Sequence, residues 1–405
     1  MQLESVQNCF NKLIQICGKN GFLNIGRTDS STAICYGPLG SLLKRNVFRE
    51  WLFSVLNNSD ATVFPVERQS REGRLLLEKI TCKATDSLLS DVVGIYIDTL
   101  PVVGCNLPFG IAAYGPCVNS MEVSSLKEST DSVLKTNLRG LKAWTRMSLA
   151  FFTPRKKATH WFHYWSHQRY LWWRKFSSIP SKFSLSEVVK TPDGNEHLSL
   201  HLEFPWGNEL LETTTLYENN FSKDLWAHHS PKHISNKNFA DMPSIVTCET
   251  ELDVAVLAYL ANSYTKKLRG EEIRNVFQLH YKLAPYKVCF SIEGNNMEFM
   301  KQLDDIRKHL TKELKSAGIL VLPKFDINSL EDTQFHYVRF DEMGIPYTVV
   351  LNHNAIQTGI VGLRNRDTTI QISFPHAKHI SEVITSLLGS LCSFSLGQDC
   401  SCDHQ

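Results

Sequence analysis

The chain has 405 residues, more than a single hydrophobic core usually serves, so its length predicts two or three domains. Hydrophobic residues at 42% and charged residues at 21% exclude a disordered or fibrous protein, and no apolar run reaches the ~18 residues of a membrane span. The formal net charge is +2, but the charges are unevenly distributed along the chain.

A first helix is expected within residues 1–20, because four apolar side chains recur there at helical spacing: Phe10, Leu13, Ile14 and Cys17. The same segment has lysines but no arginine, little serine and one glutamate, so it matches a mitochondrial presequence poorly. Composition leaves both interpretations open.

The next segments alternate between helical and extended patterns. Residues 35–56 predict a glycine/proline turn that leads into an amphipathic helix, and a short strand is expected at 61–66. Residues 67–90 are charged and then helix-like, and 91–103 are β-branched and strand-like. Residues 108–117 predict a turn followed by a buried strand.

A window without any acidic residue, 132–186, holds eleven basic residues and five tryptophans. Basic side chains neutralise phosphates and aromatic rings stack on bases, so this window predicts contact with nucleic acid. The alternative is a buried aromatic helix whose basic side chains form its solvated face. The nucleic-acid-binding candidates are Arg155, Lys156, Lys157, Arg169, Arg174 and Lys175. The first three carry the prediction best, because Pro154 indicates a loop there.

Neither the histidines nor the cysteines predict a metal site. His160, His163 and His167 share one helical face, but the surrounding cations oppose a divalent ion, so packed or solvated histidines are expected. The eleven cysteines are mostly scattered singly, without zinc-ribbon spacing. Those near the C-terminus lie in a polar, unpatterned segment, which favours a frayed end. We therefore expect no metal and no cofactor.

The first domain is expected at 1–278, with a short insertion around 67–106. Strands at 198–204 and 244–248 and a buried helix at 254–264 complete it. Antiparallel-looking strands separated by long excursions favour an α+β fold.

A second domain is expected at 279–390, and 391–405 as a flexible tail. Glu298 to Ser316 is strongly amphipathic, and Gly318 follows as its stop. The order β-α-β-α-β-β-β-α predicts a mixed sheet with helices on its faces. The expected strands are 287–292, 319–322, 346–351, 360–363 and 368–374, and the other helices are 329–340 and about 380–388. Without a phosphate loop or a nucleophile elbow, this pattern predicts a recognition domain.

Two sets of motifs carry a resemblance to aminoacyl-tRNA synthetases. The run CYGPLGSLLKRN at 35–46, followed by Trp51, is similar to a signature of eukaryotic-type glycyl-tRNA synthetases. LAPYKV at 283–288, DEMGIPY at 341–347 and LRNRDT at 363–368 resemble the anticodon-binding domain of class IIa synthetases. The resemblance implies a class II synthetase-like antiparallel sheet domain followed by an α/β anticodon-binding-like domain with a mixed sheet.

Three further segments point past the synthetases. Residues 107–117, 168–183 and 204–213 resemble the family of mitochondrial DNA polymerase accessory subunits. With the synthetase motifs they cover most of the chain, in order.

The resemblance also implies that the synthetase reaction is lost. In the synthetases one arginine holds the ATP α-phosphate and a second holds the γ-phosphate. The corresponding stretches here, Cys117 to Ser120 and Glu251 to Ala255, contain no arginine. Glu209 persists from a third element, but the glycine and arginine of that element do not. Removing one such anchor typically costs ~10²–10³ in rate, so we expect no enzyme activity.

The family resemblance implies a non-catalytic processivity subunit in the mitochondrial matrix and nucleoid. It would bind the catalytic subunit of the polymerase and primer-template duplex DNA, with the acid-free window on the DNA. The C-terminal domain would face the polymerase, with exposed candidates His353, Asn354, Arg364, Arg366 and Asp367. For the two arginines a hairpin turn with solvated charges is an equal alternative.

Two questions stay open at this point. A glycyl-tRNA-synthetase-like ligase and a tRNA- or RNA-binding regulator are the alternative functions. Family homodimers carry a long helical insertion after the strand that contains 64–66, and only 67–106 stand there in this chain. A weaker homodimer and a monomer in a one-to-one complex with the polymerase are therefore both open.

Overall fold

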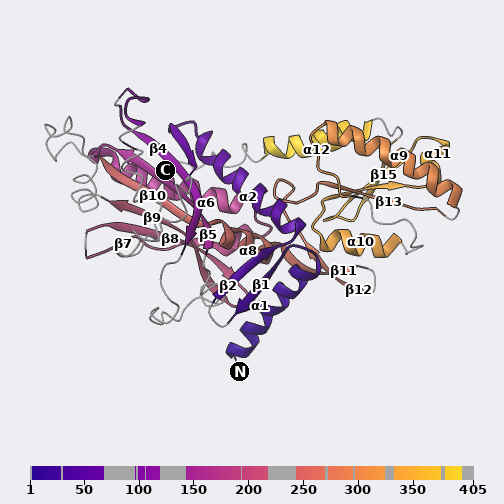
Figure 1. Ribbon diagram of the computed structural model, residues 1–405, viewed down its shortest axis with the longest axis horizontal. Helices are drawn as coiled ribbons and strands as arrows, with labels where there is room; N and C mark the ends of the chain where they lie inside the picture. The colour runs from indigo at the N-terminus through magenta and orange to yellow at the C-terminus, as the bar shows by residue number, and fades with distance from the viewer. Residues whose placement is uncertain are drawn as a thin grey trace, which may run out of the picture.

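The structure is a computed structural model. It describes residues 2–28, 31–67, 96, 99–104, 106–118, 143–192, 194–217, 243–269, 272–294, 297–323, 333–374 and 379–394. A large sheet with its helices forms one half, and a smaller sheet flanked by helices forms the other (Figure 1). Within these residues no helix is both long and apolar enough to span a bilayer. The expected α+β class is confirmed.

The N-terminal elements pack a helix and a hairpin against a second, longer helix. They are α1 (Gln2–Lys19), β1 (Leu23–Thr28), β2 (Ser31–Tyr36) and α2 (Pro38–Leu56). The first segment is thus a folded helix, and Phe10 and Cys17 are buried on its inner face. Pro38 opens α2, where a missing N–H costs nothing. A Cβ on Gly40 would lie 1.8 Å from the carbonyl oxygen of Phe22, so only glycine fits there.

The eight-stranded sheet has the order β3-β4-β5-β10-β9-β8-β6, with β7 paired to β8. All its neighbouring strands are antiparallel except β3 and β4. The strands are β3 (Val63–Glu67), β4 (Phe109–Val118), β5 (Ala143–Thr153), β6 (Phe183–Leu185), β7 (Val189–Lys190), β8 (Glu196–Phe204), β9 (Gly207–Tyr217) and β10 (Ser244–Glu251).

Helices cover one face of this sheet and form the main core with it. They are α2, α6 (Ala158–Lys175) and α8 (Leu252–Ser263), with the short helices η3 (Arg155–Lys157) and η4 (Pro180–Lys182) at the two ends of the α6 segment. Alternate residues of β8, such as Leu200 and Leu202, point into this core. Trp173 of α6 stacks on Tyr259 of α8 with ring centroids 5.4 Å apart.

The C-terminal half is built around the sheet β13-β14-β15-β16. Its first pair is parallel and the other pairs are antiparallel, which confirms the expected mixed sheet. The hairpin β11–β12 precedes it. The elements are β11 (Tyr264–Arg269), β12 (Glu272–Phe277), β13 (Val288–Ile292), α9 (Met297–Ser316), α10 (Thr333–Glu342), β14 (Tyr347–Leu351), α11 (His353–Gln357), β15 (Val361–Asn365), β16 (Gln371–Phe374) and α12 (Ile380–Phe394).

Some expected elements differ from the observed ones. The strand expected at 91–103 is wrong where it is described, because Tyr96 and Thr99 are helical and a turn follows. The strand expected at 319–322 is reduced to a single bridge between Val321 and Val288. Most of the insertion at 67–106 lies outside the described residues. The flexible tail was expected from 391, but α12 continues to Phe394, and 395–405 lie outside the described residues. The boundary at 278/279 stays a prediction.

Candidate functional site

The first candidate site lies where α8 begins, in the stretch 251–255 where the synthetase resemblance predicts the γ-phosphate arginine. This stretch has Val254 and no arginine, and Asp253 before it is buried. The Tyr36 hydroxyl and the Lys44 ammonium each donate to Asp253 Oδ1 at 2.7 Å, and the Thr145 amide donates to Oδ2 at 3.0 Å. Both carboxylate oxygens are therefore already used.

These contacts join three segments that lie far apart in the chain. Tyr36 precedes the GPLG turn, Lys44 follows it, and Thr145 lies on β5. Burial raises the pKa of Tyr36 well above its usual value, and the neighbouring Asp253 adds to the rise. Tyr36 stays neutral and acts as a hydrogen-bond donor. The cluster is built to hold the three segments together.

The other two synthetase elements show the same change of role. The α-phosphate arginine is expected within 117–120. Cys117 of β4 is buried there, and positions 119 and 120 lie outside the described residues. Glu209 is buried and accepts a hydrogen bond from Trp206 Nε1 at 3.0 Å. Its carboxylate is thus engaged within the protein. No described residue of these elements supplies a phosphate-binding arginine.

The second candidate site is the N-terminal end of α6. Arg155, Lys156 and Lys157 form η3 directly before the helix, and all three are exposed. The first turn of α6 has no acidic residue, so the positive end of the helix dipole adds to their charge. An anion is favoured at this position. The loop predicted after Pro154 is therefore the short helical turn η3, and its basic side chains face solvent.

Arg169 needs a correction, because it is 2% exposed and does not belong to any basic surface. Its Nε and Nη2 donate to the two Glu212 oxygens at 2.7 and 3.2 Å, and Trp173 Nε1 donates to the same carboxylate. The guanidinium also lies 4.5 Å from the Trp172 ring centre. A buried cation needs such a partner. Arg169 therefore forms a buried ion pair within the core and is not available to bind DNA.

Four of the five tryptophans of the window follow the alternative interpretation. Trp161, Trp165, Trp172 and Trp173 are buried, which leaves no ring face for a base. By contrast His160, His163 and His167 are exposed, as is Lys175 at the end of the helix. Arg174 is half-buried, with its guanidinium 5.0 Å from the Tyr170 ring centre. The basic candidates that remain on the surface lie at the two ends of α6.

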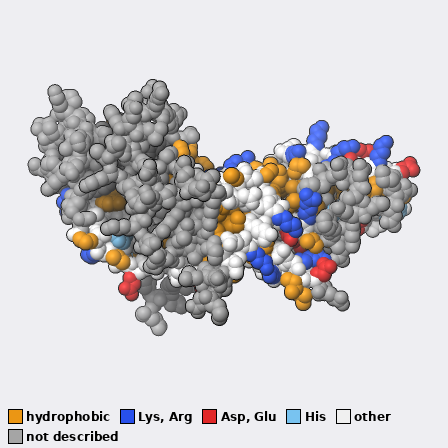
Figure 2. Space-filling model, turned by 60° about the horizontal axis from the view of Figure 1, so that its bottom comes forward, with side chains coloured by type: hydrophobic (Ala, Val, Ile, Leu, Met, Phe, Trp, Pro, Cys, Tyr) orange, Lys and Arg blue, Asp and Glu red, His pale blue; other side chains and the backbone are white. Residues whose placement is uncertain are grey.

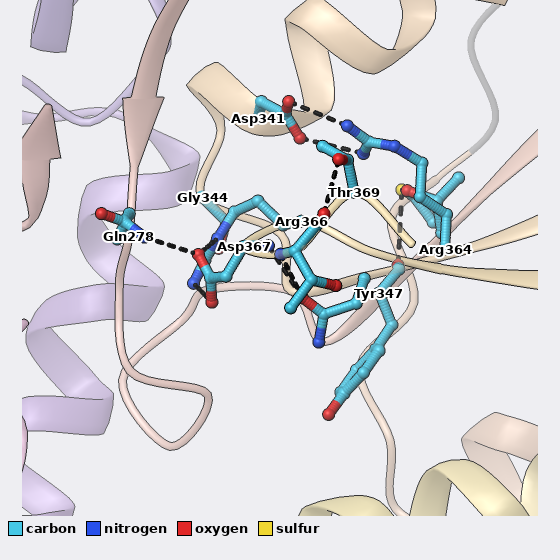
Figure 3. A network of polar contacts seen from close by, with 12 residues as sticks. Gln278, Asp341, Gly344, Tyr347, Arg364, Arg366, Asp367 and Thr369 are labelled. Carbon is cyan, nitrogen blue, oxygen red and sulfur yellow. Dashed lines mark hydrogen bonds and ion pairs between the residues drawn. The ribbon is translucent and has the colours of Figure 1, made fainter. Parts of the chain in front are cut away.

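The third candidate site is the polar network of the C-terminal domain (Figure 3). Arg364 donates from both terminal nitrogens to Asp341, at 3.0 Å each. Arg366 donates to the carbonyl oxygens of Gly344 and Leu279, at 2.8 and 3.0 Å, and pairs with Asp367.

The expected exposure of Arg364 and Arg366 is wrong, since they are 5% and 3% exposed. The expected turn is real, because the chain reverses after Arg366 with Thr369 at a φ of 60°. The two arginines, however, are buried beneath the turn. Arg364 pairs with Asp341 of α10, and Arg366 donates to the carbonyl oxygens of Gly344 and of Leu279 in the linker. The exposed members of the set are Asp367, His353 and Asn354.

Asp367 remains a charged surface group. Burial alone would raise its pKa, but the hydrogen bond and the charge of Arg366 outweigh that and hold the pKa below its usual value. Gln278 Nε2 donates to the same carboxylate at 3.0 Å. His353 opens α11 and contacts Phe299 of α9 edge-on, at 4.8 Å between ring centres. One face of the C-terminal half shows basic side chains beside hydrophobic and acidic ones (Figure 2).

The roles of Asp253 and Glu212 were missed by reasoning from sequence. The sequence did contain one signal for the Asp253 contact. Lys44 and Asp253 both lie within or beside synthetase motifs that lack their phosphate-binding arginines. Among the described residues, no group of three or more histidines, cysteines or carboxylates lies close enough to hold a metal.

Comparison with known proteins supplies the context for these sites. Residues 288–386 match the family model "Anticodon binding domain". DNA polymerase subunit gamma-2 of Bos taurus is 29% identical, over 93% of this chain and 85% of its own. The mitochondrial DNA polymerase subunit gamma-2 of Xenopus laevis is 26% identical, over 92% and 85%. A glycine–tRNA ligase of Treponema denticola is 24% identical, over 73% of this chain and 64% of its own. The expected resemblance is confirmed.

Proposed function

We propose that this chain, a relative of DNA polymerase subunit gamma-2, is the non-catalytic accessory subunit of a mitochondrial DNA polymerase. The observation that carries the proposal is the similarity over 93% of the chain, in both halves of the fold. The distant glycine–tRNA ligases account for the synthetase-like architecture. We place the protein in mitochondria, and in the matrix and nucleoid, where mitochondrial DNA is copied.

The state of the former catalytic centre supports a binding role. Adenylation needs positive groups aimed at the phosphates of ATP. Val254 provides no charge, and the carboxylate of Asp253 accepts from three internal donors. The cluster stabilises the scaffold.

The accessory role requires two surfaces, one for the polymerase and one for DNA. For the polymerase we propose the exposed part of the C-terminal set, His353, Asn354 and Asp367. For primer-template DNA we propose Arg155, Lys156 and Lys157, with Lys175 and Arg174 at the far end of α6. Each phosphate contact slows dissociation from DNA, so a polymerase held by this subunit extends further before it falls off.

Primer extension by the cognate catalytic subunit, with and without this chain, tests the proposal. Reactions are run across a salt series, because phosphate contacts weaken as salt rises. Longer products and tolerance of higher salt are expected in the presence of the chain. Equal product lengths with and without it, at every salt concentration, would defeat the proposal.

The ligase and RNA-binding alternatives have their own tests. Glycine-dependent exchange of pyrophosphate into ATP is expected to stay at background, and a clear signal would revive the ligase. The anticodon-binding match favours a regulator that binds tRNA, so tRNA and primer-template DNA should be compared as competitors. Tighter binding of tRNA would favour that second function.

The number of copies in the complex is a separate question. The chain mass is 46.1 kDa, so light scattering after size exclusion separates a monomer from a dimer of twice that mass. The segment expected to build a family dimer interface, 67–106, is short for a helical bundle. We propose a monomer in a one-to-one complex, and a dimer mass would overturn this.

A further inference from the structure

Positive side chains from three segments converge where the two halves of the fold meet. They come from α2, from the end of α6 and from the linker between β12 and β13. We call this set the junction cluster. Its lysines and arginines are Arg45, Arg49, Lys175, Lys282 and Lys287, and the buried His280, which is neutral near pH 7, lies among them.

Contacts around Glu50 bring α2 and the linker together. Arg49 Nη2 lies 3.5 Å from one Glu50 oxygen, and Lys282 Nζ lies 3.8 Å from the other. Glu50 is buried, so its carboxylate is shared between these cations below the surface. Arg49 keeps 61% of its side chain exposed, and Arg45, four residues earlier on the same helical face, is exposed too.

Ring contacts bring the end of α6 to the same place. The Phe176 ring packs edge-on against His280, with centroids 5.2 Å apart. The Lys175 ammonium lies 5.7 Å from the centre of that Phe176 ring, and Lys175 is exposed. Lys287 sits deeper and donates to the carbonyl oxygens of Lys282 and Ala284 at 3.0 and 2.8 Å.

The titration of the buried members agrees with a strongly positive site. Burial, with the charges of Lys282, Lys175, Lys287 and Arg366, lowers the pKa of His280 to about 3. Burial and the nearby arginines, opposed by Glu50, lower the pKa of Lys287 to about 7. Like charges gathered in this way repel one another, and an anion would relieve that repulsion.

The length of α6 relates this cluster to the basic turn at its other end. Its 18 residues span roughly 27 Å at 1.5 Å per residue. One turn of duplex DNA is about 34 Å long, so both ends of α6 can reach phosphates within a single turn. The outward residues between them, His160, His163 and His167, add no negative charge.

We propose that the junction cluster is a second contact for the phosphodiester backbone of duplex DNA, which lies along α6 between this cluster and Arg155–Lys157. Arg45, Arg49 and Lys175 make the outer contacts. Lys282 and Lys287 hold the linker in place behind them. The choice of duplex DNA as the ligand rests on the proposed function. The affinity for a phosphodiester backbone follows from the charges of the cluster alone.

The test uses the full chain and a 20-base-pair duplex in fluorescence anisotropy across a salt series. The junction variant carries Arg45→Gln, Arg49→Gln and Lys175→Gln. A matched control removes the same charge from α9 through Lys301→Gln, Lys312→Gln and Lys315→Gln, all at exposed positions. The junction variant is expected to bind about tenfold more weakly or worse, with a salt slope flatter by about 2 to 3. The control is expected to stay within about threefold.

A second measurement does not depend on the variants. Binding of the duplex brings phosphates to the cluster, so the NMR-detected pKa of His280 should rise in the complex. An unchanged salt slope in the junction variant, an equal loss in the control, or an unmoved His280 pKa would each overturn the proposal. If tRNA binds the cluster more tightly than the duplex, duplex DNA is the wrong occupant.

Failure of the accessory-subunit proposal would look different. In that case the chain would bind the duplex through the cluster but would not lengthen the products of the polymerase. If instead the products lengthen and the junction variant binds DNA like the wild type, only the second contact is refuted.

Discussion

The buried pair of Asp341 and Arg364 offers a sharp test of what holds the C-terminal domain together. Asp341 is fully buried, Arg364 is 5% exposed, and the two side chains share two hydrogen bonds of 3.0 Å. The Arg364 guanidinium also lies 4.6 Å from the Tyr337 ring centre. Asp341→Asn keeps the shape of the side chain but leaves a buried cation without its counter-ion, which should cost about 3–5 kcal/mol of unfolding free energy.

Replacing both partners tests the reason for this cost. The double variant Asp341→Leu, Arg364→Met removes the unpaired charge along with the pair, so it should lie within about 1–2 kcal/mol of the wild type. Because a chain with several domains rarely unfolds in two states, hydrogen exchange of the β14 and β15 amides should accompany thermal melting. Asp305→Asn, at an exposed position of α9, is the control. The reasoning is refuted if the single variant loses less than about 1 kcal/mol, or if the double variant is as unstable as the single one.

The other sites give four further predictions. Asp253→Ala leaves the Tyr36 hydroxyl, the Lys44 ammonium and the Thr145 amide without their acceptor, and should lower the unfolding free energy by about 2–4 kcal/mol; a change under about 1 kcal/mol in thermal unfolding would contradict this. His280 has a pKa of about 3 in the fold and 6.5 as a free side chain, so the unfolded chain binds more protons between these values and stability should rise with pH across that window. Lys282→Gln should raise the His280 pKa, and an NMR titration that shows no rise would speak against the electrostatic cause. Charge reversal of Arg155, Lys156 and Lys157 to Glu should weaken duplex binding and flatten its salt slope by up to about 3, and unchanged binding would leave the basic turn without a role on DNA.

Periodic segments were predicted well from sequence, and segments without periodicity were not. The amphipathic pattern placed α9 within one residue of its observed start, because five apolar side chains repeat on one face. The hairpin β11–β12 was missed, since the segment KKLRGEEIRN shows no apolar–polar alternation. Leu268 and Ile273 pair across it although both are 72% exposed.

The burial of the arginines could not be predicted, because their partners lie far away in the chain. Arg169 meets Glu212 across 43 residues, and Arg366 reaches the carbonyl oxygen of Leu279 across 87. A sequence shows that a residue is basic, but only the fold shows whether a buried carboxylate pairs with it. Candidates chosen by charge alone therefore mixed core arginines with surface ones.

The join between the two halves of the fold explains how surfaces on each could work together. Leu279 and Leu283 of the linker and Met343 after α10 belong to the same hydrophobic core as α2, α6 and α8. The Asn46 side chain of α2 donates to the carbonyl oxygens of Leu283 and Ala284, at 3.1 and 3.0 Å. A shared core and buried hydrogen bonds resist bending at the linker. A subunit that ties a polymerase to its template gains from this rigidity, because binding at one surface then positions the other without a further loss of entropy. Asp253 contributes to the same rigidity, because its carboxylate connects α8 to α2 and β5.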